Sequence, residues 1–307
     1  MTKQRRFACA CDVTAQRRDT ALMAHANIYA FAAEAVGSAT ALVIAAGAGM
    51  GVDSGLPDFR GDEGFWRAYP PFKRLGLSFV DLANPRWFDD DPALAWGFYG
   101  HRLNLYRATA PHAGFEILRR WAALARDGGL VFTSNVDGHF QRAGFPDDSL
   151  FECHGSIHWL QCTGACGAGL FPADGVAVEI DTATFRAHPP LPTCPHCKAV
   201  ARPAVLMFGD SDWDSSRSDA QAARLETWLA RRRSQEARII VVECGAGMAV
   251  PTVRGFSESL VRQFGARLVR INVREPQAPT GQIAIAEPAL AALTAIDARL
   301  ANRVLVG

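Results

Sequence analysis

Four of the eight cysteines form two closely spaced pairs. Three residues separate Cys162 from Cys166, and two residues separate Cys194 from Cys197. Two such pairs suit one tetrahedral zinc ion, and four thiolates would fill all of its coordination positions. The spacing therefore predicts one structural Zn²⁺ per chain, with no open position for activating water. Free reduced thiols, or His196 in place of one cysteine, are the alternatives.

One histidine lies among residues suited to catalysis. His154 is part of the segment 152–156 (Glu-Cys-His-Gly-Ser), just before the first cysteine pair. Histidine is the natural general base near neutral pH. The segment 133–137 (Thr-Ser-Asn-Val-Asp) follows a short apolar run, and α/β sheets bind ligands where their strands end. We expect His154, Asn135 and Asp137 to share one crevice. The alternative is a structural histidine.

A glycine-rich turn follows another apolar run. Residues 47–51 read Gly-Ala-Gly-Met-Gly. Glycine lets the backbone turn tightly and approach a phosphate, and a helix N-terminus adds a favourable dipole. Residues 54–61 (Ser-Gly-Leu-Pro-Asp-Phe-Arg-Gly) add a rigid turn, a carboxylate, an aromatic ring and a guanidinium. Together these segments predict a dinucleotide site. A strand-to-turn connection without a ligand is the alternative.

The histidine, the glycine-rich turn and the polar residues 133–137 can share a site only in a fold that brings the ends of several strands together. Short apolar runs typical of buried parallel strands cover residues 41–46, 130–133, 239–242 and 267–272. Helical patterns cover residues 21–36, 111–126, 218–236, 254–264 and 287–301. This alternation predicts an α/β fold with a doubly wound, parallel, Rossmann-like sheet.

Two segments interrupt the alternation. Residues 61–104 are rich in Trp, Phe and Pro, and residues 156–202 hold the cysteine pairs. We expect them to form a smaller domain, in which a helical insertion joins a zinc module. The Rossmann-like domain, which would bind the dinucleotide, would then comprise residues 21–60, 105–155 and 203–307. The polar residues 1–20 are expected to be a disordered N-terminal extension.

The composition narrows the range of partners. The 307 residues carry a formal net charge of +1, with 49% hydrophobic and 21% charged residues. There is no basic excess for direct, non-specific binding of nucleic acid. No run approaches the roughly 18 apolar residues needed to span a membrane, and the N-terminus lacks the apolar core of a secretory signal. We expect a cytoplasmic enzyme without membrane contact.

Taken in order, these motifs resemble the sirtuin family of NAD-dependent protein deacylases. Residues 47–60 are similar to its first motif, and residues 133–137 to its Thr-Gln-Asn-(Ile/Val)-Asp motif. His154-Gly155, before the cysteines, matches its His-Gly pair. Residues 202–210 resemble its Arg-Pro…Val…Phe-Gly-Glu segment, and Ile271-Asn272 its late Ile-Asn.

The chain departs from the family pattern at several positions. Gly51 replaces a serine, Ser134 replaces a glutamine near the NAD ribose, and Asp210 replaces a glutamate. Residues 245–247 (Gly-Ala-Gly) replace Gly-Thr-Ser, so that two hydroxyl groups are lost. We expect the NAD chemistry to survive, with changes in how the cofactor and the peptide are held.

The resemblance implies NAD as co-substrate and an acyl-lysine protein or peptide as partner, with nicotinamide and O-acyl-ADP-ribose as products. The implied catalytic residues are His154, as general base, and Asn135, which with Asp137 would help to form the nicotinamide pocket. The implied cofactor-binding residues are Gly47, Ala48, Gly49, Asp58, Phe59, Arg60, Ser134, Asn135, Asp137, Gly245, Ala246 and Asn272. The implied substrate-binding residues are Tyr99, Arg102, Val205, Phe208 and Gly209.

One pair of residues bears on the acyl group. Tyr99 and Arg102 are three residues apart on a predicted helix and thus share a face. A Tyr-x-x-Arg pair here resembles the sirtuins that remove succinyl and malonyl groups. Arg102 could pair with an acyl carboxylate through two parallel bonds, and Tyr99 could add a third. The alternative is a solvated arginine and a tyrosine packed in the small domain.

Two rival functions stay open. The same fold could transfer ADP-ribose to another acceptor or hydrolyse NAD, and the altered segment 245–247 leaves room for this. His154 argues against it, because hydrolysis does not need that base. The second rival is a non-catalytic module that binds ADP-ribose or a partner, with zinc as its scaffold.

Overall fold

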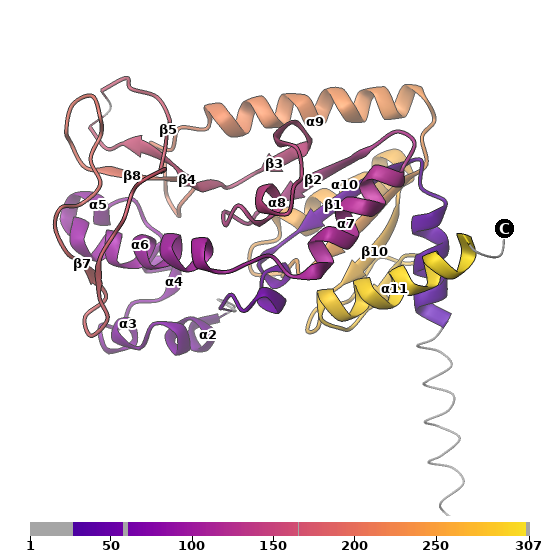
Figure 1. The fold of residues 1–307 in the computed structure, drawn as a ribbon, viewed down its shortest axis with the longest axis horizontal. Coiled ribbons are helices and arrows are strands. Elements are labelled where there is room, and N and C mark those ends of the chain that lie inside the picture. Colours follow the sequence, from indigo (N-terminus) through magenta and orange to yellow (C-terminus); the bar gives the residue numbers. More distant parts are fainter. Residues whose placement is uncertain (1–26, 58–60, 165, 305–307) are drawn as a thin grey trace, which may run out of the picture.

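The computed structural model describes residues 27–57, 61–164 and 166–304 (Figure 1). The predicted N-terminal extension lies outside these residues. The first helix is described over residues 27–37. The other helices are α2 (Gly61–Ala68), α3 (Pro70–Arg74), α4 (Phe79–Leu82), α5 (Trp87–Asp90), α6 (Pro92–Ala108), α7 (Ala113–Leu124), α8 (His139–Arg142), α9 (Ser216–Ser234), α10 (Thr252–Phe264) and α11 (Ala289–Val304). None of the helices in this part of the chain combines the length and apolar character needed to span a bilayer.

A six-stranded parallel sheet forms the larger part of the molecule. Its strands are β1 (Ala41–Ala46), β2 (Gly129–Thr133), β3 (Leu150–Glu152), β9 (Ile239–Cys244), β10 (Arg267–Ile271) and β11 (Ile283–Ile285). They lie in the order β11-β10-β9-β1-β2-β3, and every neighbouring pair is parallel. Counted along the chain within this sheet, the order is that of a doubly wound Rossmann fold. The predicted fold class is confirmed.

Helices cover both faces of the sheet because successive strand residues point to opposite sides. In β1, Leu42, Ile44 and Ala46 face a core shared with the first helix, α7 and α11. Ala41, Val43 and Ala45 face a second core, shared with α9 and α10. All six side chains are fully buried, and Figure 1 shows α9 along one face and α11 along the other. A strand buried on both faces needs an unbroken apolar run, which is why β1 could be read from the sequence.

The second part of the molecule has a different core. Segments 61–108 and 155–205 share one cluster of buried side chains that is rich in aromatic rings. In it, the indole of Trp96 on α6 donates a hydrogen bond of 2.8 Å to the carbonyl of Ala201. Such contacts support the predicted grouping of the two insertions into one small domain. The division into domains stays a prediction.

Two small antiparallel sheets hold the cysteine-bearing segment. Strand β4 (Gly155–Cys162) lies between β5 (Phe171–Pro172) and β8 (Ala201–Val205), and β6 (Ile180–Asp181) pairs with β7 (Arg186–Ala187). Gly97 of α6 lies against β7, where a Cβ atom would be 1.8 Å from the carbonyl oxygen of Phe185. Only glycine lets the helix approach this backbone so closely.

The four predicted strands are confirmed as β1, β2, β9 and β10; β1 has the predicted bounds, and each of the other three differs by one or two residues at one end. The structure adds β3 and β11, which the sequence reading missed. Each has three residues, too few for a periodic pattern. They complete the two edges of the sheet, and β3 leads directly to His154.

Candidate functional site

The centre of the site lies beside β1, where the order of the strands in the sheet reverses. Strand β1 lies between β2, which follows it on one side, and β9, which returns on the other. Ligands of doubly wound sheets bind in the crevice at the carboxyl ends of such strands. Here the turn after β1 (47–51) meets the loop after β9 (245–251), and the two are joined by hydrogen bonds from Gly47 N to Cys244 O and from Gly49 N to Gly245 O, each 3.0 Å.

Two glycines permit this contact. Gly245 has φ +65°, and a Cβ atom there would lie 2.3 Å from the backbone of Gly49 and Met50. A Cβ atom on Gly47 would lie 2.8 Å from Ala246 Cα. The two loops therefore pack backbone against backbone. After the turn, Ala48–Met50 and Val52–Ser54 form short 3₁₀ helices, so no long helix begins at the glycines.

The end of β2 brings a second set of groups to the same edge. The Thr133 hydroxyl donates to Ala46 O (2.9 Å) and accepts from Asn135 N (3.0 Å). The Asn135 side-chain amide donates to Gly47 O at 3.0 Å, and Ser134 N donates to Ala46 O at 3.1 Å. Asn135 is thus held against the glycine-rich turn, as the shared crevice requires.

Asp137 lies deeper, with 6% of its surface exposed. Its carboxylate accepts a bond of 2.9 Å from His139 N, and its carbonyl accepts one of 2.9 Å from His158 Nε2. His158 is on β4, so this contact ties the end of β2 to the cysteine-bearing segment. The carboxyl group is fixed in a mostly buried position, where a hydrogen-bonding ligand would find a pre-organised partner.

His154 follows β3 and is half-buried. Its carbonyl accepts a bond of 3.0 Å from Leu206 N, and its Nε2 lies 3.4 Å from the hydroxyl of Thr252, the first residue of α10. Burial lowers the pKa of His154 below its ordinary value of 6.5. A neutral imidazole is thereby favoured near pH 7, which is the form that a general base requires.

The end of β10 contributes Asn272, which is 2% exposed. Its side-chain amide donates a bond of 2.7 Å to Ala246 O. The predicted cofactor residues that the structure brings to this edge are Gly47, Ala48, Gly49, Ser134, Asn135, Asp137, Gly245, Ala246 and Asn272. Asp58, Phe59 and Arg60 lie outside the described residues. The roles of all of these residues stay predictions.

The predicted substrate residues Val205, Phe208 and Gly209 lie on the far side of His154. Phe208 N donates to Ala83 O at 2.8 Å, and its ring contacts Phe79 edge-on with centroids 6.2 Å apart. Val205 is buried at the end of β8, whereas Phe208 is 37% exposed. Gly209 has φ +68° and turns the chain there. This segment forms an apolar edge beside the histidine.

Asp210, where the family usually has glutamate, is anchored below that edge. Its carboxylate forms a bidentate pair with Arg202, with distances of 2.7 and 2.8 Å. Both side chains are almost fully buried. The Asp210 side chain therefore stabilises the conformation of the segment 205–210.

Tyr99 and Arg102 are both buried on α6, so the alternative of a solvated arginine is wrong. Arg102 Nε donates to the Tyr106 hydroxyl at 2.9 Å, and its guanidinium lies 5.3 Å from the Phe98 ring centroid and 5.9 Å from that of Phe79. Within the described residues, the Tyr99 hydroxyl has no hydrogen-bond partner although it is buried. Burial of an unpaired hydroxyl is costly.

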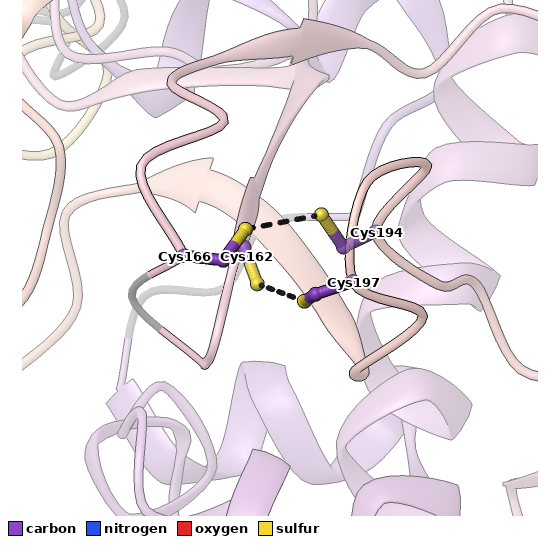
Figure 2. A group of neighbouring side chains, drawn as sticks. All are labelled: Cys162, Cys166, Cys194 and Cys197. Atoms are coloured by element: carbon purple, nitrogen blue, oxygen red, sulfur yellow. Dashed lines mark hydrogen bonds between the residues drawn. The ribbon is translucent and has the colours of Figure 1, made fainter.

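The four predicted metal ligands come together (Figure 2). Their sulfur atoms all lie within 4.8 Å of one another, with 3.4 Å between Cys162 and Cys197 and 3.6 Å between Cys166 and Cys194. A tetrahedral zinc with bonds of about 2.3 Å separates its sulfur ligands by about 3.8 Å. The cluster fits such an ion, and His196 is not among the residues that converge on it.

The sequence reading missed three residues of the site. Thr252 faces His154, and Arg254 and Glu275 hold the loop after β9. No motif marks them, because their roles depend on which loops the sheet brings together. The only local signal is that Pro251-Thr252 is suited to the start of a helix.

The chain is similar to a known family and to solved structures. A model of the Sir2 family matches residues 47–227, more than half of the chain. The NAD-dependent protein deacylase of Aeropyrum pernix is 30% identical over 231 residues, which cover 74% of this chain and 78% of that protein. NAD-dependent protein deacylase 1 of Pseudomonas aeruginosa is 32% identical over 241 residues, or 78% and 85% of the two chains.

A crystal structure of a Sir2 homologue in complex with NAD superposes with a TM-score of 0.62. It is 26% identical to this chain, and the match covers 89% of this chain and 93% of that one. The similarity thus spans both the parallel sheet and the cysteine-bearing segment.

Proposed function

The chain belongs to the Sir2 family, and on that basis we propose that it is an NAD-dependent protein deacylase that removes acyl groups from lysine side chains. The products would be nicotinamide and O-acyl-ADP-ribose. The observation that carries the proposal is the position of His154. It is half-buried and has a lowered pKa, its ring lies beside Thr252 at the start of α10, and its carbonyl is bonded to Leu206, two residues before Phe208 of the apolar edge.

Each side of this crevice would hold one substrate. The loops after β1, β2, β9 and β10 would bind NAD, with Asn135 and Asp137 forming the nicotinamide pocket. The apolar edge at Val205 and Phe208 would bind the acyl-lysine. The acyl oxygen would form a bond to C1′ of the ribose as the bond to nicotinamide breaks.

His154 would act after nicotinamide has left. It would take a proton from a ribose hydroxyl, whose oxygen then attacks the acyl carbon. The carbon–nitrogen bond to lysine would then break as the amine takes up a proton. A water molecule would add to the acyl carbon and release the oxygen on C1′, so that the acyl group stays on the attacking ribose oxygen as O-acyl-ADP-ribose. Burial keeps the imidazole neutral before this step, and a proton transfer of this kind contributes about 10²–10⁴-fold to the rate.

Buried Tyr99 and Arg102 support a finer proposal, that acidic acyl groups such as succinyl and malonyl are substrates beside acetyl. A buried guanidinium suits a carboxylate at the end of the acyl chain. The Tyr99 hydroxyl, which has no hydrogen-bond partner in the described part of the chain, could supply one more bond, and Phe79 links this region to Phe208 at the apolar edge.

The cysteine cluster would bind one Zn²⁺ through Cys162, Cys166, Cys194 and Cys197. Four thiolates close the coordination sphere, so the ion would stabilise the fold and take no part in the reaction.

A panel of one peptide carrying acetyl, malonyl or succinyl lysine, incubated with NAD and analysed by mass spectrometry, tests the proposal. O-acyl-ADP-ribose is expected in equal amount to the nicotinamide released. Free ADP-ribose, or ADP-ribose attached to protein, would instead support the rival NAD hydrolase or transferase. No nicotinamide release, with binding of ADP-ribose in calorimetry, would support a binding module.

A further inference from the structure

The loop between β9 and α10 has no polar side chain of its own to fix its shape. Residues 245–250 read Gly-Ala-Gly-Met-Ala-Val. Ala246 is buried at the start of the loop, but Met248 is 59% exposed and Val250 is 44% exposed, so apolar burial does not hold the rest of it. It nevertheless lies at the centre of the crevice, against the glycine-rich turn. Whatever fixes it must come from neighbouring elements.

The segment after β10 supplies part of the answer. The Asn272 amide donates to Ala246 O, and its side-chain oxygen accepts from Arg274 N (3.0 Å) and Glu275 N (3.1 Å). This turn presents the Glu275 carboxylate to the loop, where it accepts a bond of 2.9 Å from Met248 N. Two consecutive points of the loop are thus tied to the end of β10.

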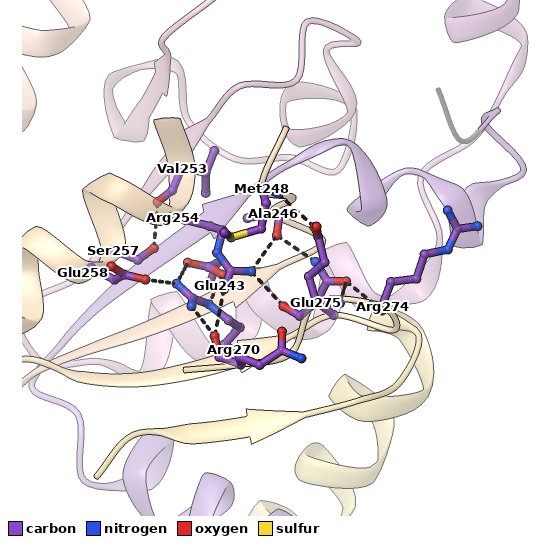
Figure 3. Close-up of polar contacts among 12 residues, drawn as sticks. Glu243, Ala246, Met248, Val253, Arg254, Ser257, Glu258, Arg270, Arg274 and Glu275 are labelled. Carbon is purple, nitrogen blue, oxygen red and sulfur yellow. Dashed lines mark hydrogen bonds and ion pairs between the residues drawn. The ribbon is translucent and has the colours of Figure 1, made fainter. Parts of the chain in front are cut away.

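Arg254 supplies the rest from the first turn of α10 (Figure 3). Its side chain is 6% exposed, and its guanidinium donates to Glu275 O and Gln277 O, each at 2.8 Å. The same group reaches Ala246 O at 3.4 Å. One rigid fork therefore spans the loop after β9 and the segment after β10, as the geometry of a guanidinium allows.

A buried ion pair joins β9 and β10, the two strands that carry these loops. Arg270 of β10 contacts Glu243 of β9, with 3.0 Å between Nη2 and Oε2, and both side chains are at most 1% exposed. Arg270 also donates to Gln277 O at 2.6 Å and pairs with Glu258 at 3.0 Å. The ends of β9 and β10 cannot shift independently of each other while these bonds persist.

We propose that Arg254 and Glu275 are positioning residues for NAD, which clamp the loop 245–251 in the shape that receives the dinucleotide. The inference rests on the proposed function. Neither residue needs to touch NAD, because its effect is to remove the cost of ordering the loop on binding. The loop has no hydroxyl groups that could hold its own shape, and Arg254 and Glu275 hold it instead.

The test compares NAD affinity with turnover. Glu275→Ala and Arg254→Met are each expected to raise KM for NAD and Kd for ADP-ribose about tenfold, because each loses hydrogen bonds to a charged group. The kcat at saturating NAD and the KM for the acyl peptide should stay within about twofold of wild type. Glu275→Gln keeps an acceptor for Met248 N and should restore most of the NAD affinity.

Two control variants separate positioning from general stability. Glu258→Gln weakens the same network but contacts neither loop, so it should lower the melting temperature and leave KM for NAD unchanged. Arg262→Met removes a mostly exposed arginine in the last turn of α10 and should change neither.

Wild-type KM for NAD in both clamp variants, or an equal rise in Glu258→Gln, would overturn the inference. If Arg254→Met does not fold, the Glu275 pair of variants decides alone. The proposed function fails separately, if the wild-type enzyme neither binds NAD nor releases nicotinamide.

Discussion

The two walls of the crevice are built from different kinds of contact. On the wall formed by the sheet, the turn after β1 meets the loop after β9 through backbone atoms, with Gly49 N bonded to Gly245 O. On the side of the small domain, side chains make the contacts, and Arg102, which we propose as a substrate-binding residue, is surrounded by the rings of Phe79 and Phe98. A wall made of backbone depends on glycines and changes little in shape. A wall made of side chains can change its selectivity by one substitution.

The cores behind the two walls differ in the same sense. The sheet is stabilised by aliphatic side chains such as Leu42 and Val241, which lie on central parallel strands that are buried on both faces. The small domain combines an aromatic cluster with small antiparallel sheets, three of whose strands have only two residues, and a group of four thiols. We therefore expect its stability to depend on metal, and that of the sheet to be independent of it.

Metal removal should have the largest effect. Zinc contributes about 10 kcal/mol or more to the folding of isolated zinc modules, so chelation or Cys197→Ala should unfold the cysteine-bearing segment and abolish deacylation. Hydrogen exchange should show lost protection in residues 155–205 and retained protection in β1 and β9. Cys153→Ala, a thiol outside the cluster, should keep one zinc per chain in metal analysis. A freshly purified protein without zinc but with a stable small domain would contradict this prediction.

His154→Ala should reduce deacylation by about 10²–10⁴-fold, because a positioned general base contributes that much. Binding of ADP-ribose, which depends on the backbone wall, should be unchanged in calorimetry. His188→Ala offers a control histidine in the small domain, remote in sequence from the proposed catalytic motifs. Deacylation at the wild-type rate in His154→Ala would show that the base is another group.

Arg102→Met should change the small-domain wall alone. Leaving a buried carboxylate without its partner costs about 2–5 kcal/mol, so kcat/KM for a succinyl-lysine peptide should fall far more than for the acetyl version. Arg107→Met, a partly buried arginine on the same helix that donates to backbone carbonyls, is the matched control. Equal losses on both peptides, or a wild-type preference for acetyl-lysine, would mean that Arg102 only stabilises the small domain.

The smallest expected effect is a shift in pH dependence. Burial lowers the pKa of His154, so the acid side of the kcat/KM profile for deacylation should lie below pH 6.5. Exchange of labelled nicotinamide into NAD precedes the base-catalysed step and should not share that limb. An acid limb above pH 6.5 would show that His154 is not held neutral by burial.

The same pKa shift has a consequence for stability. Because the folded pKa of His154 is lower than the unfolded one, the unfolded state binds the proton first as the pH falls. The contribution of this residue to stability is therefore present above the unfolded pKa and is lost as the pH falls through the folded pKa. His154→Ala should reduce the acid sensitivity of the melting temperature.

Patterns within short segments were readable from the sequence. The runs 41–46 and 239–242 are apolar at every position because both faces of a central parallel strand are buried. The edge strands β3 and β11 were not predicted, because three residues are too few to show a periodic pattern of apolar side chains. The cysteine pairs predicted their cluster because metal ligands must be close in space, and a short loop guarantees that within each pair.

Contacts between segments far apart in the chain were not readable. The sequence does not indicate that Thr252 contacts His154 or that Arg254 contacts Ala246. These contacts depend on where α10 begins relative to β3 and β9. Tyr99 and Arg102 could be placed on one helical face by their spacing. Whether that face was solvated or buried depended on packing around α6, where Phe79 of α4 lies against Arg102.

The sequence by itself determined the fold class, the glycine-rich turn and the ligand set of the cysteine cluster, since each follows from local backbone preferences or from spacing along the chain. Tertiary structure decided which loops meet at the carboxyl edge, that Gly245 needs φ +65° to lie against Gly49, and that Arg102 is buried. The physical reason is that burial and loop contacts are set by packing over the whole chain. A local sequence pattern determines only which side chains a helix or strand presents on each face, and not which other segments pack against that face.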